Sequence, residues 1–302
     1  MRLPLSAPWL MLGAAFLFAT MGVCVKLATV HYDAGEIVMY RSLVGALLVM
    51  ALVRWRGGSL RTRVPAMHVG RSVSGVASLA LWFYAIGGLP LATAVTLNYM
   101  SSVWMALFLI GGAVLVGGAR VDGRLVTAVL VGFVGVALVL RPAIDQQQLW
   151  HGLAGLLSGV LAAMAYLQIT ALGRAGEPDY RIVFYFSLGG VLVGFVLSLA
   201  TSGLHAHGLV GAALLLAIGL LATIAQLMMT RAYAIGRPLS NAALQYTGIV
   251  FAYAWGALVF GDEITAFALA GIALIVAAGL AATLLRARVV APRGRAADAP
   301  GP

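Results

Sequence analysis

The stretch Ile37-Val38-Met39-Tyr40-Arg41-Ser42-Leu43-Val44-Gly45 is the first copy of a repeat and recurs 145 residues later as Ile182-Val183-Phe184-Tyr185-Phe186-Ser187-Leu188-Gly189-Gly190. Six of the nine positions are identical. A second match keeps the same order: Tyr84-Ala85-Ile86-Gly87, followed by Pro90-Leu91, returns as Tyr233-Ala234-Ile235-Gly236, followed by Pro238-Leu239. Two matches in the same order predict that the chain is a duplication.

The composition excludes a water-soluble globular protein. The chain has 302 residues, of which 62% are hydrophobic and 9% are charged, and its mean hydropathy is +1.02. Soluble domains are about 45–50% apolar and about 25% charged. Intrinsic disorder is excluded as well, because disordered chains are poor in apolar residues. The single cysteine, Cys24, excludes a disulfide within the chain and a cysteine-based metal cluster.

Ten apolar runs, separated by glycine, proline or charged residues, predict ten membrane-spanning helices. A span needs about 20 apolar residues, and continuous runs of this length satisfy their backbone groups in lipid only as helices. The expected fold class is therefore an all-α polytopic membrane protein. The predicted spans lie near residues 9–30, 36–53, 66–87, 91–116, 125–141, 152–172, 182–201, 209–231, 239–260 and 266–285.

The basic residues predict how these spans are oriented. With the N-terminus in the cytoplasm, 15 of the 19 lysines and arginines fall on the cytoplasmic side and only Arg141 falls on the other. The remaining three, Lys26, Arg41 and Arg71, lie within spans. This positive-inside asymmetry predicts a multi-pass protein of the cell inner membrane with both termini in the cytoplasm. It also explains the net charge of +10 without a nucleic-acid partner, and some attraction to anionic membrane lipids is expected with it.

Each copy of the repeat contains five spans, an odd number, so the second copy is expected to enter the membrane in the opposite direction. The turns agree, because Gly87-Gly88-Leu89-Pro90 has no basic residue whereas its counterpart Gly236-Arg237-Pro238 has one. We expect two inverted five-helix repeats, at residues 1–148 and 149–285, and a flexible cytoplasmic tail at 286–302. Secondary transporters are commonly built this way, with the substrate site near the midplane between the halves.

Short motifs along the chain support this interpretation. They are Arg41 in the second span, Leu89-Pro90-Leu91-Ala92-Thr93-Ala94 leading into Leu97-Asn98-Tyr99, Gly135-Val136-Ala137-Leu138-Val139-Leu140-Arg141-Pro142, and Phe260-Gly261-Asp262-Glu263. Together they resemble the ten-span EamA-type branch of the drug/metabolite transporter (DMT) superfamily, over about residues 9–285. The resemblance implies a transporter, commonly an exporter of amino acids or other metabolites, with a central cavity lined largely by spans 1, 3, 4, 6, 8 and 9 and with no cofactor. In one departure from the family, Gly117-Gly118-Ala119-Arg120 stands where an acidic residue is expected, and only the second copy keeps it, as Glu263.

Polar and aromatic side chains within the spans are the candidate substrate pathway, because polar groups in lipid usually face the interior of a helix bundle. For serine and threonine, hydrogen bonds within or between packed helices are an alternative role. The amides of Asn98, Gln226 and Gln245 are harder to satisfy within one helix. The candidate pathway residues are Asn98, Tyr99, Gln226, Gln245, Tyr246, Trp82, Tyr166, Ser78 and Lys26.

The three basic residues within spans have their own expected roles. Lys26, near the outer end of the first span, either extends to the membrane surface, pairs with Glu36 or contacts a substrate carboxylate. Glu36 and Arg41 are expected to form a structural ion pair at the outer end of the second span. Arg71 is expected to anchor the inner end of the third span at the membrane interface.

The acidic residues and the histidines fall in predicted loops, in the tail or at the ends of spans. The sequence therefore offers no carboxylate or imidazole in the middle of the membrane to relay protons, which disfavours proton antiport through a buried glutamate. We expect a secondary transporter that exports or exchanges a small neutral, zwitterionic or anionic metabolite, such as an amino acid, by alternating access.

Two alternatives remain open. A flippase for a lipid-linked headgroup shares the fold and needs a lateral cavity open to lipid. A membrane-embedded enzyme needs clustered acids for a metal, or a nucleophile with a buried base. The sequence offers neither, so no catalytic residue and no metal site is predicted, and His205-Ala206-His207 is expected to be a solvated turn. The GxxxG spacings at 155–159 and 190–194 indicate close helix packing, in a monomer or a weak homodimer.

Overall fold

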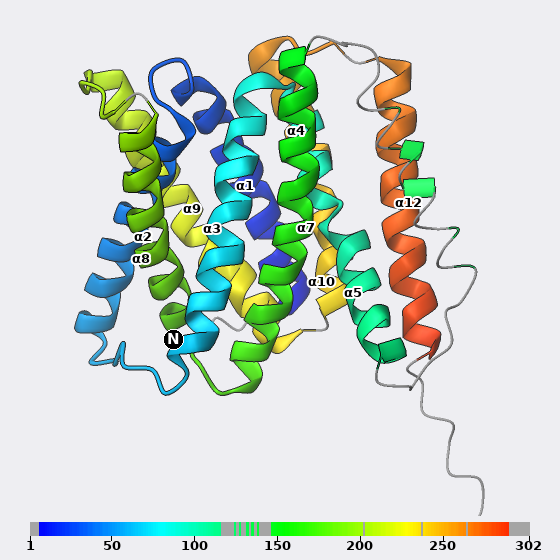
Figure 1. Ribbon diagram of the computed structural model, residues 1–302, viewed down its shortest axis with the longest axis horizontal. Helices are drawn as coiled ribbons and strands as arrows, with labels where there is room; N and C mark the ends of the chain where they lie inside the picture. The colour runs from blue at the N-terminus through cyan, green and yellow to red at the C-terminus, as the bar shows by residue number, and fades with distance from the viewer. Residues whose placement is uncertain are drawn as a thin grey trace, which may run out of the picture.

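The computed structural model describes residues 6–115, 146–201, 203–236, 238–263 and 265–289, with isolated positions between 124 and 138. Within these residues every regular element is a helix, and most helices run between two opposite ends of the molecule (Figure 1). The elements are α1 (Ala7–Ala28), α2 (Ala34–Trp55), α3 (Pro65–Gly88), α4 (Leu91–Tyr99), α5 (Ser101–Leu115), α7 (Gln146–Arg174), α8 (Asp179–Ala200), α9 (Leu209–Ile235), α10 (Pro238–Gln245), α11 (Thr247–Trp255), the π-helix η1 (Gly256–Phe260) and α12 (Ala266–Val289).

Seven helical segments of the described residues are long and apolar enough to cross a membrane, so the chain is a multi-pass membrane protein. They are α1, α2, α3, the segment Leu91–Leu109, α7, α8 and α9. The spans predicted at 239–260 and 266–285 match the shorter apolar segments Thr247–Phe260 and Leu269–Ala278. Most of the span predicted at 125–141 lies outside the described residues.

Proline and glycine mark where several helices begin and end. Pro65 opens α3 and Pro238 opens α10, where a missing backbone N–H leaves no intrahelical bond unmade. Gly57 follows the end of α2 with φ 65°, and Gly176 follows the end of α7 with φ 82°. This left-handed backbone closes a helix C-terminus and disfavours residues with a Cβ.

Helices from the two predicted repeats interlock. α3 packs mainly against α7, α2 against α8, and α1 against α9. Glycines allow the closest approaches: a Cβ at Gly159 on α7 would lie 2.8 Å from the carbonyl oxygen of Leu97, and one at Gly190 on α8 would collide with Ser42. The GxxxG glycines Gly159 and Gly190 therefore serve packing within one chain.

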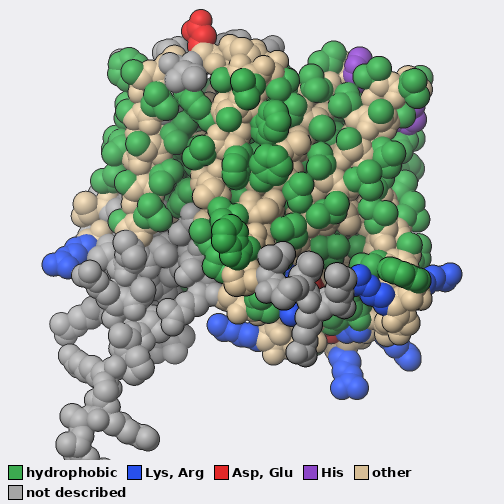
Figure 2. Space-filling view, turned by 180° about the vertical axis from the view of Figure 1, so that it is seen from behind, with side chains coloured by type: hydrophobic (Ala, Val, Ile, Leu, Met, Phe, Trp, Pro, Cys, Tyr) green, Lys and Arg blue, Asp and Glu red, His purple; other side chains and the backbone are tan. Residues whose placement is uncertain are grey.

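The polar residues of the surface are divided between the two ends of the molecule. Lys and Arg side chains gather at one end, while acidic and histidine side chains are seen at the other (Figure 2). We call the first the basic end. It carries the exposed residues Arg54, Arg56, Arg61, Arg63 and Arg174. The opposite end carries the α1–α2 turn and the segment between α8 and α9. The surface between the ends is largely apolar, as expected for lipid contact.

Candidate functional site

Two helical segments, α4–α5 and α10–α11, are each interrupted beside an amide side chain. The path of α4 and α5 is interrupted at Met100, two residues after Asn98, and that of α10 and α11 at Tyr246, next to Gln245. Both interrupting residues keep right-handed helical dihedrals, with φ −55° and ψ −13° at Met100 and φ −59° and ψ −21° at Tyr246. Interruptions at matching places in two halves often mark a transporter's substrate site.

A buried cavity of about 50 Å³ lies beside these interruptions. Helices α1, α2, α3, α4, α7, α8, α9 and α10 each contribute to its wall. A water molecule occupies about 30 Å³ in the liquid, whereas ligand pockets measure about 300–1,000 Å³. In this conformation the cavity is therefore too small for a drug-sized ligand.

Seven of the nine predicted pathway residues line this one cavity: Ser78, Trp82, Asn98, Tyr99, Tyr166, Gln226 and Gln245. They come from α3, α4, α7, α9 and α10, so residues far apart in the sequence meet at one place. Aromatic side chains from α3, α4 and α7 make the wall partly apolar, and the amides add hydrogen-bonding groups. Such a wall can hold a solute by stacking and by hydrogen bonds.

The amides of the cavity differ in how well their hydrogen bonds are satisfied. Asn98 Nδ2 donates to Ser158 Oγ at 2.9 Å, which is a good interhelical bond. Gln226 Nε2 donates to Thr230 Oγ1 at 3.4 Å, and Gln245 Oε1 accepts from the hydroxyl of Tyr233 at 3.4 Å. These two bonds are long, so Gln226 and Gln245 are freer than Asn98 to turn to a solute.

Ser78 forms a hydrogen bond between packed helices, which is the alternative role that the sequence leaves open for serine. Its hydroxyl donates to the carbonyl oxygen of Ser158 at 2.8 Å and so ties α3 to α7. The same residue Ser158 accepts the bond from Asn98. This side of the cavity wall is therefore a fixed junction between helices.

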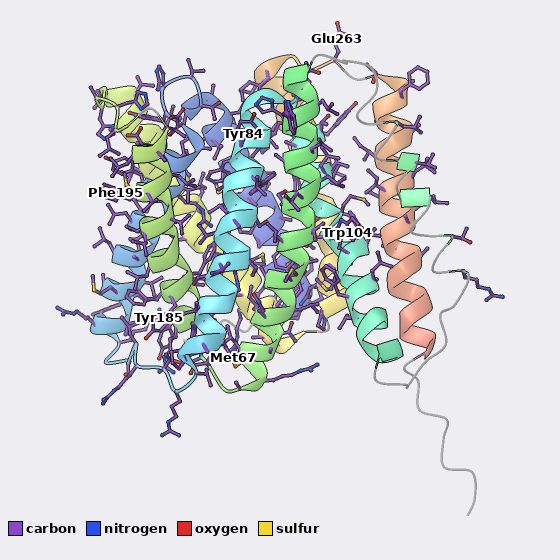
Figure 3. The ribbon with its side chains drawn as sticks, in the orientation of Figure 1. Met67, Tyr84, Trp104, Tyr185, Phe195 and Glu263 are labelled. Carbon is purple, nitrogen blue, oxygen red and sulfur yellow. The ribbon has the colours of Figure 1, made fainter. Side chains whose placement is uncertain are left out.

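The other two predicted pathway residues lie away from the cavity wall. Lys26 Nζ is 3.4 Å from Asp262 Oδ1 and lies 4.6 Å from the centre of the Phe260 ring, at the opposite end. Asp262 also accepts the backbone N–H of Leu91, which holds the start of α4. Lys26 thus forms an ion pair, with Asp262 in place of Glu36. Tyr246 is buried at the α10–α11 interruption, and Glu263 is exposed at the opposite end (Figure 3).

The expected ion pair between Glu36 and Arg41 is wrong, because each residue has another partner. The Glu36 carboxylate is fully buried, and it accepts the backbone N–H of His205 and meets His205 Nδ1 at 2.8 Å. Arg41 lines the cavity and donates from Nη2 to Gln226 Oε1 at 3.4 Å. The physical reason is the spacing: helix neighbours are three or four residues apart, and a separation of five places the side chains on different faces.

Arg71 also departs from its expected role as an interface anchor. It is 2% exposed and lines the cavity, close to the Phe186 ring. The sequence holds a signal for this, because Ser78 and Trp82 follow Arg71 at intervals of seven and eleven residues. Those intervals correspond to about two and three helical turns, so the three side chains share one face of α3.

Polar residues join the loops at the opposite end. His207 Nε2 and the Tyr40 hydroxyl are 2.6 Å apart, and His207 Nδ1 lies 3.2 Å from the Tyr32 hydroxyl. Together with the contact between His205 and Glu36, these bonds fasten the segment before α9 to the α1–α2 corner. His205-Ala206-His207 is therefore more than a solvated turn. In the part of the chain that the structure describes, no group of three or more potential metal ligands is found.

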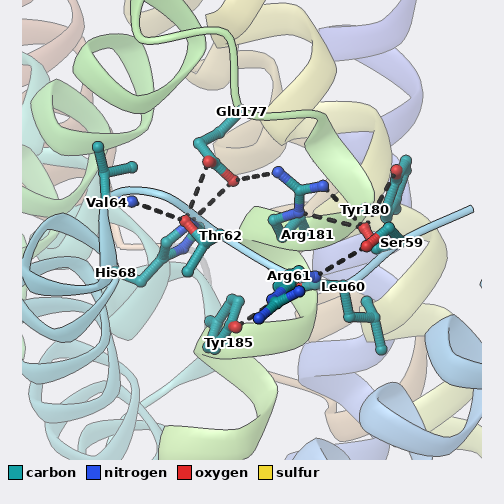
Figure 4. A network of polar contacts seen from close by, with 10 residues as sticks. All are labelled: Ser59, Leu60, Arg61, Thr62, Val64, His68, Glu177, Tyr180, Arg181 and Tyr185. Atoms are coloured by element: carbon teal, nitrogen blue, oxygen red, sulfur yellow. Dashed lines mark hydrogen bonds and ion pairs between the residues drawn. The ribbon is translucent and has the colours of Figure 1, made fainter.

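At the basic end, Glu177 is the centre of a second network (Figure 4). Its carboxylate accepts bonds from Thr62 Oγ1 at 2.9 Å and from Arg181 Nη1 at 3.0 Å, and it meets His68 Nε2 at 3.1 Å. Burial alone would raise the pKa of Glu177, but these hydrogen bonds hold it below its ordinary value. The network ties the α2–α3 loop to the α7–α8 corner.

Replacing Glu177 by glutamine is expected to lower the melting temperature by about 2–6 °C at pH 7.5, because a buried charge-assisted bond is lost. A lowered folded-state pKa stabilises the protein above the ordinary carboxyl pKa, and this contribution is lost as the pH falls. Thermal unfolding of the purified protein from pH 7.5 to 3.5 should show the gap between Glu177→Gln and wild type narrowing. The exposed Glu263→Gln is the control, and a gap that does not depend on pH would contradict the expectation.

Comparison with known proteins agrees with this architecture. A sequence profile described as the EamA-like transporter family matches residues 5–141. The chain is 35% identical over 272 residues to the pseudopaline exporter CntI of Pseudomonas aeruginosa, covering 89% of this chain and 92% of that protein. It is 26% identical over 275 residues to an uncharacterized transporter of Helicobacter pylori, covering 87% of this chain and 89% of that one.

A solved crystal structure has the same fold, with a TM-score of 0.68 at 19% identity over 94% of this chain and 99% of that chain. The profile describes a family of transporters, and the sequence relatives are named as transporters. The chain is therefore a membrane transporter and not an enzyme. The chain belongs to the EamA-like transporter family of the DMT superfamily.

Proposed function

We propose that this chain is a secondary transporter that exports or exchanges a small neutral, zwitterionic or anionic metabolite, such as an amino acid, by alternating access. The observation that carries the proposal is the buried cavity, whose wall combines amides and aromatic rings from both predicted repeats. The pseudopaline exporter similar to this chain supports movement of a metabolite outward.

The inverted repeat at residues 1–148 and 149–285 is supported by which helices pack together. In the two repeats, α1 corresponds to α7, α2 to α8, and α3 to α9. The contact of α3 with α7 then becomes the contact of α9 with α1, and that of α2 with α8 stays itself. A two-fold relation in the membrane plane has this property. At the C-terminus, α12 continues to Val289, so residues 286–289 of the predicted tail are helical, and the rest of that tail lies outside the described residues.

Alternating access requires a closure at each end that can be released in turn. The network around Glu177 at the basic end and the one around Glu36 and His205 at the opposite end supply two such closures. The two networks also lie at equivalent places in the repeat. Tyr40, at the opposite end, and Tyr185, at the basic end, occupy matching positions in the duplicated stretch. With the basic end in the cytoplasm, as the positive-inside rule predicts, the Glu177 network is the inner closure.

A second candidate function, a flippase for a lipid-linked headgroup, is favoured by one observation. A groove of about 620 Å³ lies between α3 and α8, on the side where Figure 3 labels Tyr185 and Phe195. Its wall is mostly apolar and includes Val69, Val73 and Leu192. Such a groove suits an acyl chain. It shares no described residue with the polar cavity, however, so the carrier of a small solute remains the first proposal.

Counterflow into proteoliposomes tests the two functions side by side. Vesicles holding the purified protein are loaded with pseudopaline or with single amino acids, with and without a pH gradient, and uptake of the same labelled solute is followed. The same preparation is assayed for movement of a labelled phospholipid between leaflets. Counterflow of a small solute without lipid movement is expected. Lipid movement without counterflow would establish the flippase instead.

Replacing Gln245 by alanine is expected to raise KM about tenfold for the carried solute, with the amount of folded protein unchanged. One hydrogen bond contributes about 0.5–1.5 kcal/mol, and 1.4 kcal/mol corresponds to tenfold in affinity. Initial counterflow rates over a range of solute concentrations measure this. Gln168→Ala, on α7 and outside the cavity wall, is the matched control. Equal KM values in Gln245→Ala and wild type would remove Gln245 from the pathway.

A further inference from the structure

We infer that the central cavity binds its substrate through an oxyanion group, a carboxylate or a phosphate, held between the guanidinium groups of Arg41 and Arg71. The inference rests on the proposed function and narrows its substrate class from neutral, zwitterionic or anionic metabolites to anionic ones. Neither arginine was expected in the pathway from the sequence.

The two arginines come together around one aromatic ring. Arg41 extends from α2 and Arg71 from α3, and their side chains are 3% and 2% exposed. The guanidinium carbon of Arg41 lies 5.3 Å from the centre of the Phe186 ring, and that of Arg71 lies 4.3 Å from it. All three residues line the cavity. Gly75 makes room for this arrangement, because a Cβ there would collide with Arg71 Nη1.

Neither guanidinium has an anionic partner in the part of the chain that the structure describes. The Nε of Arg41, and the Nε and Nη1 of Arg71, are buried there without a hydrogen-bond partner. The only hydrogen bond from Arg41 to these residues is the long one to Gln226. A guanidinium has five N–H donors, so most of the donors in this pair have no hydrogen-bond partner among the described residues.

Among the residues that the structure describes, no acidic side chain is part of the cavity wall. The carboxylates buried in these residues are engaged elsewhere, Glu36 with His205 and Glu177 with Arg181. A buried charge without a partner is strongly unfavourable, and two neighbouring cations repel each other. Proteins tolerate such strain mainly at functional sites. An oxyanion bound between the arginines reduces both the cost of the unpaired charges and the repulsion between them. Guanidinium groups bind carboxylate and phosphate oxygens in bidentate pairs.

The repeat supports the assignment from the sequence. Arg41 and Phe186 occupy equivalent positions in the duplicated nine-residue stretch, and here they meet in space. Most residues of that stretch are identical in the two repeats. At this position, however, the first repeat has the cation of Arg41 and the second has the aromatic ring of Phe186. The pair therefore brings positive charge to one side of the cavity only. Gln226, Gln245 and the indole N–H of Trp82, which is buried without a partner among the described residues, are left for the uncharged part of the substrate.

Thermal unfolding without any ligand is the first arm of the test. Removing an unpaired buried charge is expected to raise the melting temperature, so Arg41→Met and Arg71→Met should each melt about 2–5 °C above wild type. Arg41→Lys and Arg71→Lys keep the charge and should show no rise. Arg181→Gln is the matched control, because Arg181 is paired with Glu177 and its loss should lower the melting temperature. A fall in both methionine variants equal to that of Arg181→Gln overturns the inference.

The second arm adds anions at constant ionic strength. Glutarate and glutaramide have the same shape and differ in charge, and inorganic phosphate distinguishes the two oxyanions. Each anion is added at about 50 mM, because a small fragment is expected to bind with about millimolar affinity. At this concentration glutarate or phosphate should raise the melting temperature of wild type by about 2 °C or more. Glutaramide should not, and neither anion should act on Arg41→Met or Arg71→Met. Wild type that responds to neither anion, or equally to glutaramide, overturns the inference.

These results separate the inference from the proposed function. If anions stabilise the protein only when both arginines are present, but the protein moves no solute in liposomes, the anion site is supported and the carrier function is refuted. Counterflow that is unchanged in both methionine variants leaves the carrier and refutes the anion site.

Discussion

Replacing Arg41 and Arg71 together by methionine is expected to lower kcat/KM for the carried solute by about 100-fold or more. Both guanidinium groups are buried in the cavity wall, with donors free for a substrate. A hydrogen bond to a charged group contributes about 1.5–3 kcal/mol, so the loss of two corresponds to about 10²–10⁴ in kcat/KM. Initial counterflow rates in proteoliposomes measure the effect.

The control for this prediction is an arginine outside the cavity. Arg174 is exposed at the basic end, and Arg174→Met is expected to keep kcat/KM within about twofold of wild type, since surface charges contribute little. The double Arg41→Lys, Arg71→Lys variant keeps the charge without the planar fork, so its KM should rise more than its maximal rate falls. A double methionine variant that transports at the wild-type rate would contradict the assignment.

Replacing Gly194 by leucine is expected to prevent folding. A Cβ at Gly194 would lie 2.5 Å from the backbone nitrogen of Met39 and 2.8 Å from the carbonyl oxygen of Gly35. Backbone atoms cannot turn aside as a flexible side chain can, so α8 and α2 would separate along the seam that joins the two predicted repeats. The expected loss exceeds about 4 kcal/mol, a large part of the about 5–15 kcal/mol that stabilises a typical domain.

The measurement is the yield of monodisperse protein on size exclusion, followed by thermal unfolding of whatever is recovered. Gly111 on α5 is the matched control, because it is exposed and a Cβ there would meet no atom within 4 Å. Gly111→Ala is expected to leave the yield unchanged and to raise stability slightly, since alanine favours helix more than glycine does. Normal yield and melting of Gly194→Leu would show that the α2–α8 seam is looser than described.

Hydrophobicity was sufficient to predict most of the helices. The span predicted at 66–87 is α3, Pro65–Gly88, and the one at 182–201 is α8, Asp179–Ala200. α7 begins at Gln146, six residues before the predicted 152, because a helix can continue past the apolar layer through polar residues such as glutamine. Apolar length reports the membrane core, whereas the helix ends where its capping and turn residues stop it.

The interruptions at Met100 and Tyr246 could not be predicted in the same way. Each involves a single residue that keeps helical dihedrals, and the apolar pattern runs on unchanged through both. Composition and periodicity are insensitive to so local a change, which depends on how neighbouring helices pack. The nearby amides Asn98 and Gln245 were the usable signal, and the sequence did single them out.

The candidate site was predicted in part. Polar groups in a span usually point inward, which predicts the amides and most of the aromatic residues, and seven of the nine predicted residues line the cavity. A charge in a span usually has a partner or lies at an interface, so this rule places Arg41 and Arg71 elsewhere. Helical geometry argues otherwise, since Arg41 is five residues from Glu36 and Arg71 shares a face with Ser78.

Trans-stimulation tests whether the cavity opens to one end at a time and carries an anionic solute. Uptake of a labelled solute identified by counterflow is compared in proteoliposomes that are empty and in others preloaded with the same unlabelled solute. Preloading is expected to speed uptake in wild type and to have no effect in the double Arg41→Met, Arg71→Met variant. Uptake by wild type at the same rate with and without internal solute would contradict it.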